Sequence, residues 1–115
     1  MRPEWQMYIS NHQKREQLRQ LQLEKRQEKG WVIAQKCAKI LQEKYGATKV
    51  VLFGSMLTKI HEQSDIDLAV WGLADRFYFP AYAELLDISN FSIDLVPVQN
   101  AYPHLLKAID QGHPL

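Results

Sequence analysis

The sequence has little cysteine and no long apolar segment. Cys37 is the one cysteine among 115 residues, which excludes a disulfide within the chain and a cysteine-based zinc site. This usage is typical of a reducing compartment, so we expect a cytoplasmic protein. Apolar runs such as residues 50–53 fall far short of the roughly 20 residues that cross a bilayer. The first residues show no apolar stretch resembling a secretory signal, and we expect no membrane association.

Charge is distributed unevenly, although the formal net charge is only +1. Residues 1–49 hold 11 basic and 5 acidic side chains, a net charge of +6, whereas residues 50–115 hold 3 and 8, a net charge of −5. A basic stretch can bind nucleic acid, dock a partner protein or a second copy of the chain, or form a solvated helix. Because residues 10–29 contain few aromatic side chains for base stacking, nucleic acid is the least favoured of these partners.

Hydrophobic spacing predicts alternating helices and strands. Residues 10–29 are rich in Gln, Glu, Lys and Arg with few apolar residues, which indicates an exposed polar helix. From residue 31, apolar residues recur every three or four positions up to Tyr45, which predicts an amphipathic helix that Gly46 ends. The later segments are predicted as strands over 49–53, 66–71 and 91–98, a short connection over 56–61, and helices over 79–88 and 101–111.

This order of segments predicts an α/β fold class with α+β character. We expect a small, mixed three-stranded sheet with helices packed on it. The shift in composition divides the chain into a polar, basic N-terminal helical extension over residues 1–29 and a folded domain over residues 30–115.

Three aspartates are candidates for one metal site. Asp65 and Asp67 are two residues apart at the start of a predicted strand, so both side chains leave the same face. Asp94 interrupts the apolar run of the third predicted strand, and it can lie beside Asp67 if the two strands pair. Clustered carboxylates repel one another, and a divalent cation removes the conflict. Oxygen ligands favour Mg²⁺ or Mn²⁺, and a pair of such ions can activate an attacking oxygen and neutralise phosphate.

Gly54 and Ser55 are candidates for binding phosphate. They follow an apolar strand where it enters a helical turn, and glycine lets the backbone approach a ligand closely. Backbone N–H groups, the serine hydroxyl and a helix N-terminus together favour an anion. For this turn to face the aspartates, the first strand must end where the second begins. The first two strands are therefore expected to be antiparallel, which makes the sheet mixed.

These motifs stand in a characteristic order. Leu-Phe-Gly-Ser at residues 52–55 is followed after nine residues by Asp-Ile-Asp-Leu at residues 65–68, and then by Asp94 on a later strand. This arrangement resembles the nucleotidyltransferase superfamily of DNA polymerase β. Within it, the short length and the C-terminal segment are most similar to the minimal nucleotidyltransferases encoded beside HEPN-type toxins. The resemblance covers roughly residues 31–115, so it identifies the folded domain as a nucleotidyltransferase domain and leaves the extension unexplained.

The resemblance implies a role for each candidate residue. Asp65 and Asp67 would bind Mg²⁺, as two ions, and Asp94 would be a third carboxylate, acting as a metal ligand or as the base for the acceptor hydroxyl. Gly54 and Ser55 would hold the triphosphate of ATP, which is attacked at the α-phosphate with loss of pyrophosphate. In the toxin-linked branch, AMP is transferred to a tyrosine of the HEPN ribonuclease, so this chain would be the antitoxin, alone or in a homo- or hetero-oligomer.

One segment departs from the family pattern. The family usually continues Gly-Ser with Arg or Tyr and then Ala-Arg-Gly, but residues 56–59 here are Met-Leu-Thr-Lys. The absent arginine is a phosphate clamp that Lys59 replaces only as a point charge. Two alternatives to a fully active enzyme therefore stay open. The chain could be a catalytically weak antitoxin that neutralises its toxin by binding, or a nucleotidyltransferase that acts on a small hydroxylated molecule.

Overall fold

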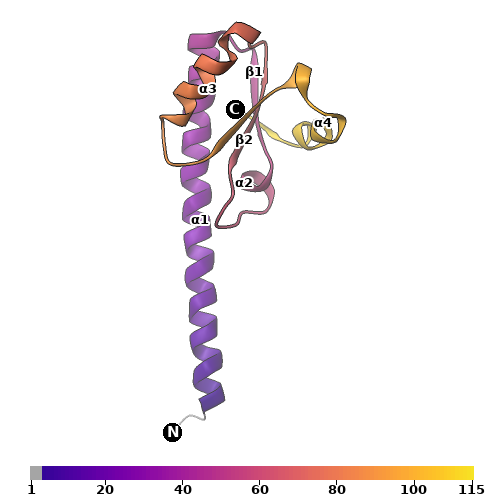
Figure 1. Cartoon of the computed structure of the whole chain (residues 1–115). Helices are drawn as coiled ribbons and strands as arrows, with labels where there is room; N and C mark the ends of the chain where they lie inside the picture. The colour runs from indigo at the N-terminus through magenta and orange to yellow at the C-terminus, as the bar shows by residue number, and fades with distance from the viewer. Residues whose placement is uncertain (1–3) are drawn as a thin grey trace.

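A single long helix dominates the computed structural model, which describes residues 4–115 (Figure 1). Helix α1 runs over Glu4–Tyr45, so the two helices expected over residues 10–29 and 31–45 are one continuous helix. Gly30 lies inside this helix, where its missing side chain makes room for Met56. Gly46 ends the helix as predicted, with a positive φ of 77°. The first three residues of the predicted extension lie outside the described residues.

The sheet has four strands in the order β3-β2-β1-β4. Strands β1 (Lys49–Phe53) and β2 (Ile66–Trp71) are antiparallel, whereas β3 (Ile93–Pro97) pairs in parallel with β2, so the predicted mixed sheet is confirmed. The prediction of three strands was wrong. A fourth strand, β4 (His113–Pro114), pairs with the outer edge of β1. This strand is two residues long and pairs through its backbone, so it leaves no hydrophobic pattern in the sequence.

Helices cover both faces of the sheet (Figure 1). On one face, α1 and α3 (Tyr78–Leu86) pack on the larger core, which includes Leu41, Leu68 and Leu85. On the other face, α4 (Pro103–Asp110) packs through Ile109 on a smaller core. Short connections complete the chain: helix α2 (Ser55–Thr58) after β1, and the 3-10 helices η1 (Asp75–Phe77) and η2 (Val98–Asn100).

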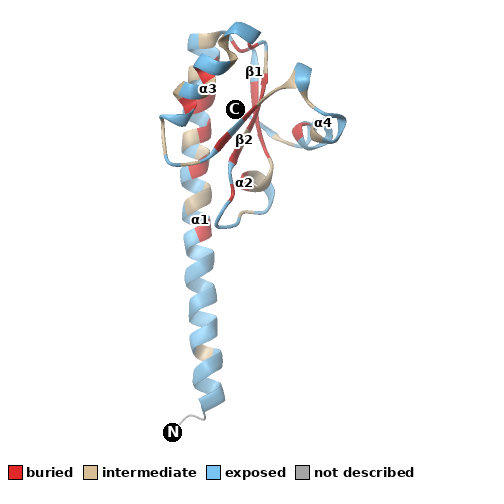
Figure 2. Cartoon of the chain, viewed as in Figure 1, coloured by how far each residue is buried: buried red, intermediate tan, exposed pale blue. Residues whose placement is uncertain are grey.

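The N-terminal part of α1 extends beyond the rest of the molecule, and with this helix included the longest dimension is 68 Å (Figure 2). Almost every side chain from residue 4 to residue 22 is exposed, and Leu23 is the first buried residue of the helix. Farther along the helix, Ala34, Cys37, Ala38 and Leu41 pack in the larger core with the sheet. Within residues 4–115, no helix is both long enough and apolar enough to cross a membrane.

Candidate active site

Strand register brings two of the three candidate aspartates side by side. Asp67 on β2 is paired with Asp94 on β3, and Asp67 also faces Phe53, the last residue of β1. Because side chains alternate along a strand, Asp67 and Asp94 lie on the sheet face opposite to the buried Ile66 and Ile93. The same face carries the smaller core under α4, and on it Asp94 is exposed and Asp67 is partly buried. The sequence predicted that Asp94 lies beside Asp67 if their strands pair, and this register is observed.

Asp65 lies just before β2 rather than within it. Its side chain and that of Asp94 are exposed, whereas Asp67 is partly buried. Burial, followed by the negative charges of Asp94 and Asp65, raises the pKa of Asp67 to about 6. The charges of Asp94 and Asp65 therefore act on Asp67, which is the most buried of the three carboxylates.

Gly54 brings the turn after β1 directly against Asp67. Its backbone has φ 82° and ψ −160°, a conformation that is essentially restricted to glycine. A Cβ atom at this position would overlap the Oδ2 atom of Asp67. The candidate phosphate turn and the candidate metal ligand are thus in contact, as the antiparallel pairing of β1 and β2 requires.

Ser55 and Ser64 join this turn to the start of β2. The Ser55 hydroxyl donates a hydrogen bond of 3.0 Å to the Ser64 hydroxyl. The Ser64 hydroxyl also accepts a hydrogen bond of 2.8 Å from the His61 N–H. Ser64 is fully buried and directly precedes Asp65. Sequence reasoning assigned no role to Ser64, although a small polar residue next to the Asp-Ile-Asp motif was a visible signal.

Two tyrosines of α3 hold the outer edge of β3. The Tyr82 hydroxyl donates to the Ile93 carbonyl at 2.6 Å, and the Tyr78 hydroxyl donates to the Leu95 carbonyl at 3.2 Å. Burial raises the pKa of Tyr82, and the nearby charge of Asp94 adds to the shift. These bonds satisfy carbonyls that would otherwise be left open on an edge strand, and they fix the strand that carries Asp94.

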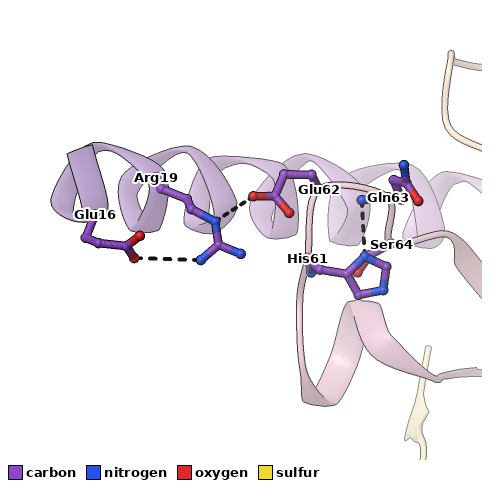
Figure 3. A network of polar contacts seen from close by, with 6 residues as sticks. All are labelled: Glu16, Arg19, His61, Glu62, Gln63 and Ser64. Carbon is purple, nitrogen blue, oxygen red and sulfur yellow. Dashed lines mark hydrogen bonds and ion pairs between the residues drawn. The ribbon is translucent and has the colours of Figure 1, made fainter. Parts of the chain in front are cut away.

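The loop before β2 is also tied to α1 (Figure 3). Arg19 on α1 forms an ion pair of 2.6 Å with Glu62, and its hydrogen bond holds the pKa of Glu62 below its ordinary value. In the same loop, the Nδ1 atom of His61 accepts a hydrogen bond from the Gln63 N–H at 3.2 Å. The basic helix therefore contacts the loop that leads into Asp65.

The donor set fits a divalent cation, although the side chains do not converge as a finished site. Across residues 4–115, no three His, Cys, Asp or Glu side chains are gathered closely enough to hold a metal ion. The chemistry nevertheless suits Mg²⁺, because all three candidate donors are carboxylates. A bound cation would offset the burial and the charge repulsion that raise the pKa of Asp67.

Most of the chain, including all the candidate site residues, matches a known protein family. Residues 35–115 match the family model described as polymerase beta, nucleotidyltransferase. The chain belongs to the polymerase β nucleotidyltransferase family. The resemblance drawn from the two motifs and Asp94 is therefore confirmed, and this nucleotidyltransferase domain accounts for about two thirds of the chain. A search of curated proteins finds no match.

Three similar solved structures are crystal structures of the toxin–antitoxin pair MntA–HepT. One, described as a mutant in which a tyrosine is replaced by alanine, shares 27% identity, with a TM-score of 0.59, over 70% of this chain and 69% of that one. A second mutant shares 24% identity, with a TM-score of 0.59, over 70% of each chain. A third structure shares 22% identity, with a TM-score of 0.56, over 73% and 69%. The nucleotidyltransferase fold of this chain is thus found in known toxin–antitoxin complexes.

The family departure at residues 56–59 has a structural explanation in this nucleotidyltransferase. Met56 is fully buried and packs against Gly30 of α1, whereas Lys59 is exposed. The residue after Gly-Ser is therefore a packing residue that fastens the turn to α1. Sequence reasoning missed this contact because the two residues are far apart in the chain and each carries a weak local signal.

Proposed function

We propose that this chain is a Mg²⁺-dependent nucleotidyltransferase that transfers AMP from ATP to a tyrosine hydroxyl of a HEPN ribonuclease toxin and so acts as its antitoxin. The observation that carries the proposal is the pairing of Asp67 with Asp94 beside Gly54, in a chain that belongs to the polymerase β family. The similarity to MntA–HepT complexes, at up to 27% identity, supports a toxin as the partner.

In the proposed reaction, the acceptor hydroxyl oxygen attacks the α-phosphorus of ATP. A new P–O bond forms, the bond from the α-phosphorus to the bridging oxygen of the β-phosphate breaks, and pyrophosphate leaves. Asp65 and Asp67 would hold Mg²⁺, which when bound neutralises phosphate charge. Asp94 would complete this ligand set or accept the proton of the attacking hydroxyl.

Gly54 and Ser55 would hold the triphosphate. The absent side chain of Gly54 keeps the backbone next to Asp67 free for a close approach. The Ser55 hydroxyl donates its hydrogen bond to Ser64, so hydrogen bonds to phosphate would come from the backbone N–H groups of the turn. The exposure of Asp65 and Asp94 leaves the acceptor side open, which suits an acceptor that is itself a protein.

The test is an intact-mass assay with Mg²⁺, ATP and the product of the adjacent gene, which this proposal expects to be a HEPN ribonuclease. We expect AMP to be added to the ribonuclease by the wild-type protein and not by Asp65→Asn or Asp67→Asn, both correctly folded. Asp110→Asn, which removes an exposed carboxylate at the end of α4, is the matched control and should keep full activity. Unchanged transfer by folded Asp67→Asn would overturn the mechanism.

A second candidate is an antitoxin that neutralises by binding alone. The specific observation in its favour is Met56, which is buried where the family usually has a basic or aromatic residue. The variant with Asn at positions 65, 67 and 94 separates the two candidates. If it still neutralises the toxin in cells, binding is sufficient; if protection is lost while the complex still forms, transfer is required.

A further inference from the structure

Helix α1 contacts two segments of the candidate site, the turn after β1 and the loop before β2. The contacting residues of α1 precede the family match, which begins at residue 35. The Gln27 side-chain amide donates to the Met56 carbonyl at 2.9 Å, in the turn after Ser55. One turn of the same helix also presents Arg26, whose guanidinium donates to the Ser64 carbonyl at 2.9 Å. The helix thus fixes the phosphate turn and the start of β2 from one side.

Ser64 is the point where these contacts meet. Its carbonyl accepts the hydrogen bond from Arg26, and its hydroxyl accepts those from Ser55 and from the His61 N–H. The residue is fully buried and is bonded in sequence to Asp65. A displacement of Ser64 would therefore move both Asp65 and the turn that holds Ser55.

Arg26 also reaches the loop before β3. The centre of its guanidinium lies 4.7 Å from the centroid of the Phe91 ring, which is the distance of a cation–π contact. Its Nε atom is buried and has no acceptor among the described residues, so the group is held by Phe91 and Ser64 rather than by a carboxylate. Phe91 lies three residues before Asp94, and the Ile66 N–H donates to the Ser92 carbonyl at 2.9 Å between the two loops.

We propose that Arg26 is a positioning residue for the candidate active site. By contacting Ser64 and Phe91 together, its planar side chain sets the separation between the loop that leads to Asp65 and the loop that leads to Asp94. It also holds the phosphate turn through Ser64 and Ser55. The geometric part of this inference stands on the contacts alone, whereas its effect on catalysis rests on the proposed nucleotidyltransferase function.

Hydrogen exchange of the full chain tests the geometric part without any substrate. In Arg26→Met, which keeps an apolar stem but removes every donor, we expect amide exchange to rise about tenfold or more at Thr58, Ser64 and Ile66. Exchange at Leu52 and Leu68 in the central strands should stay unchanged. Lys25→Met is the matched control, because Lys25 is the exposed neighbour on the same helix, and it should behave like the wild type.

Two results would overturn the proposal. One is wild-type exchange at both loops in Arg26→Met, and the other is a uniform rise across the whole domain, which would make Arg26 a general stability residue. Arg26→Lys should restore part of the protection, because an ammonium group can donate to the Ser64 carbonyl but lacks the planar fork that stacks on Phe91.

Titration with Mg²⁺ and a non-hydrolysable ATP analogue tests the functional part. Groups that orient metal-binding residues typically contribute about 10- to 100-fold to metal affinity or activity, so Arg26→Met should weaken binding by that factor while Lys25→Met does not. If the wild type fails to bind, the proposed function is wrong, and the exchange experiment still decides the role of Arg26. If loop exchange rises but binding is unchanged, Arg26 orders the loops without positioning the site.

Discussion

Asp67 is ionised at an electrostatic cost in the folded protein. Its carboxylate is partly buried, faces Asp94 across the strand pair and lies near Asp65, which together raise its pKa to about 6. An aspartate in an unfolded chain has a pKa of about 3.9. The folded protein therefore binds this proton more tightly than the unfolded chain does, and ionisation of Asp67 lowers stability as the pH rises between these two values.

This difference predicts a pH-dependent gain in stability on removing the charge. Without Mg²⁺, Asp67→Asn should unfold at a higher temperature than the wild type above pH 6, because the variant has no buried charge to accommodate. Below about pH 4, where Asp67 is protonated in both states, the gain should disappear. Thermal unfolding from pH 4 to pH 8 measures the effect, and a gain that is equal at all pH values would argue against the charge as its cause.

Gly54 has a conformational and a steric reason to be glycine. In Gly54→Ala, we expect a loss of about 1–3 kcal/mol of unfolding free energy from the backbone conformation, with further loss from overlap with Asp67. Gly46→Ala is the matched control, since Gly46 also has positive φ but no atoms of other residues within 4 Å of an added Cβ. Urea unfolding should show the larger loss at Gly54, and equal losses would mean that contact with Asp67 is unimportant.

At the level of elements, α1 has two parts with different roles. Residues 4–18 are exposed apart from the partly buried Ser10, and beyond them Arg19, Leu23 and Arg26 contact the domain. The division of the chain at residue 29 stays a prediction, but the contacts between helix and domain already begin ten residues earlier.

Two truncations separate these parts. Removing residues 1–18 should change the free energy of unfolding by no more than about 0.5 kcal/mol, the usual range for exposed positions. Removing residues 1–34 should cost several kcal/mol, because Leu23 is lost from the core and Met56 loses its cover; a buried leucine alone contributes about 2–5 kcal/mol. Urea unfolding of both proteins measures the difference, and equal stabilities would show that residues 19–34 contribute nothing.

For the molecule as a whole, the spacing of residues within each segment predicted those strands and contacts that depend on neighbouring residues. The strands over residues 49–53 and 66–71 were predicted at their observed bounds, and the antiparallel pair followed from the need to bring Gly54 to the aspartates. The neighbouring positions of Asp67 and Asp94 were also expected from their strands, while their roles in catalysis stay predictions.

Contacts between distant residues could not be predicted in this way. Strand β4 has two residues and depends on backbone pairing with β1, so no side-chain pattern announces it. The Arg26–Ser64 and Gln27–Met56 hydrogen bonds join residues 38 and 29 positions apart. In the sequence, Arg26 is one cation among many in a basic stretch, and only the packing of α1 on the loops distinguishes it.

The contact between Gly30 and Met56 shows that the segment matched by the family model is shorter than the segment that packs together in the folded protein. The family match begins at residue 35, yet the methionine that follows Gly-Ser is covered by a glycine that precedes this boundary. A gene rearrangement that joined residues 35–115 to another N-terminal segment would transfer every family motif. It would still leave the hydrophobic side chain of Met56 uncovered beside the candidate active-site turn. A transferable form of this domain that keeps Met56 covered therefore has to begin inside α1, upstream of the family motifs.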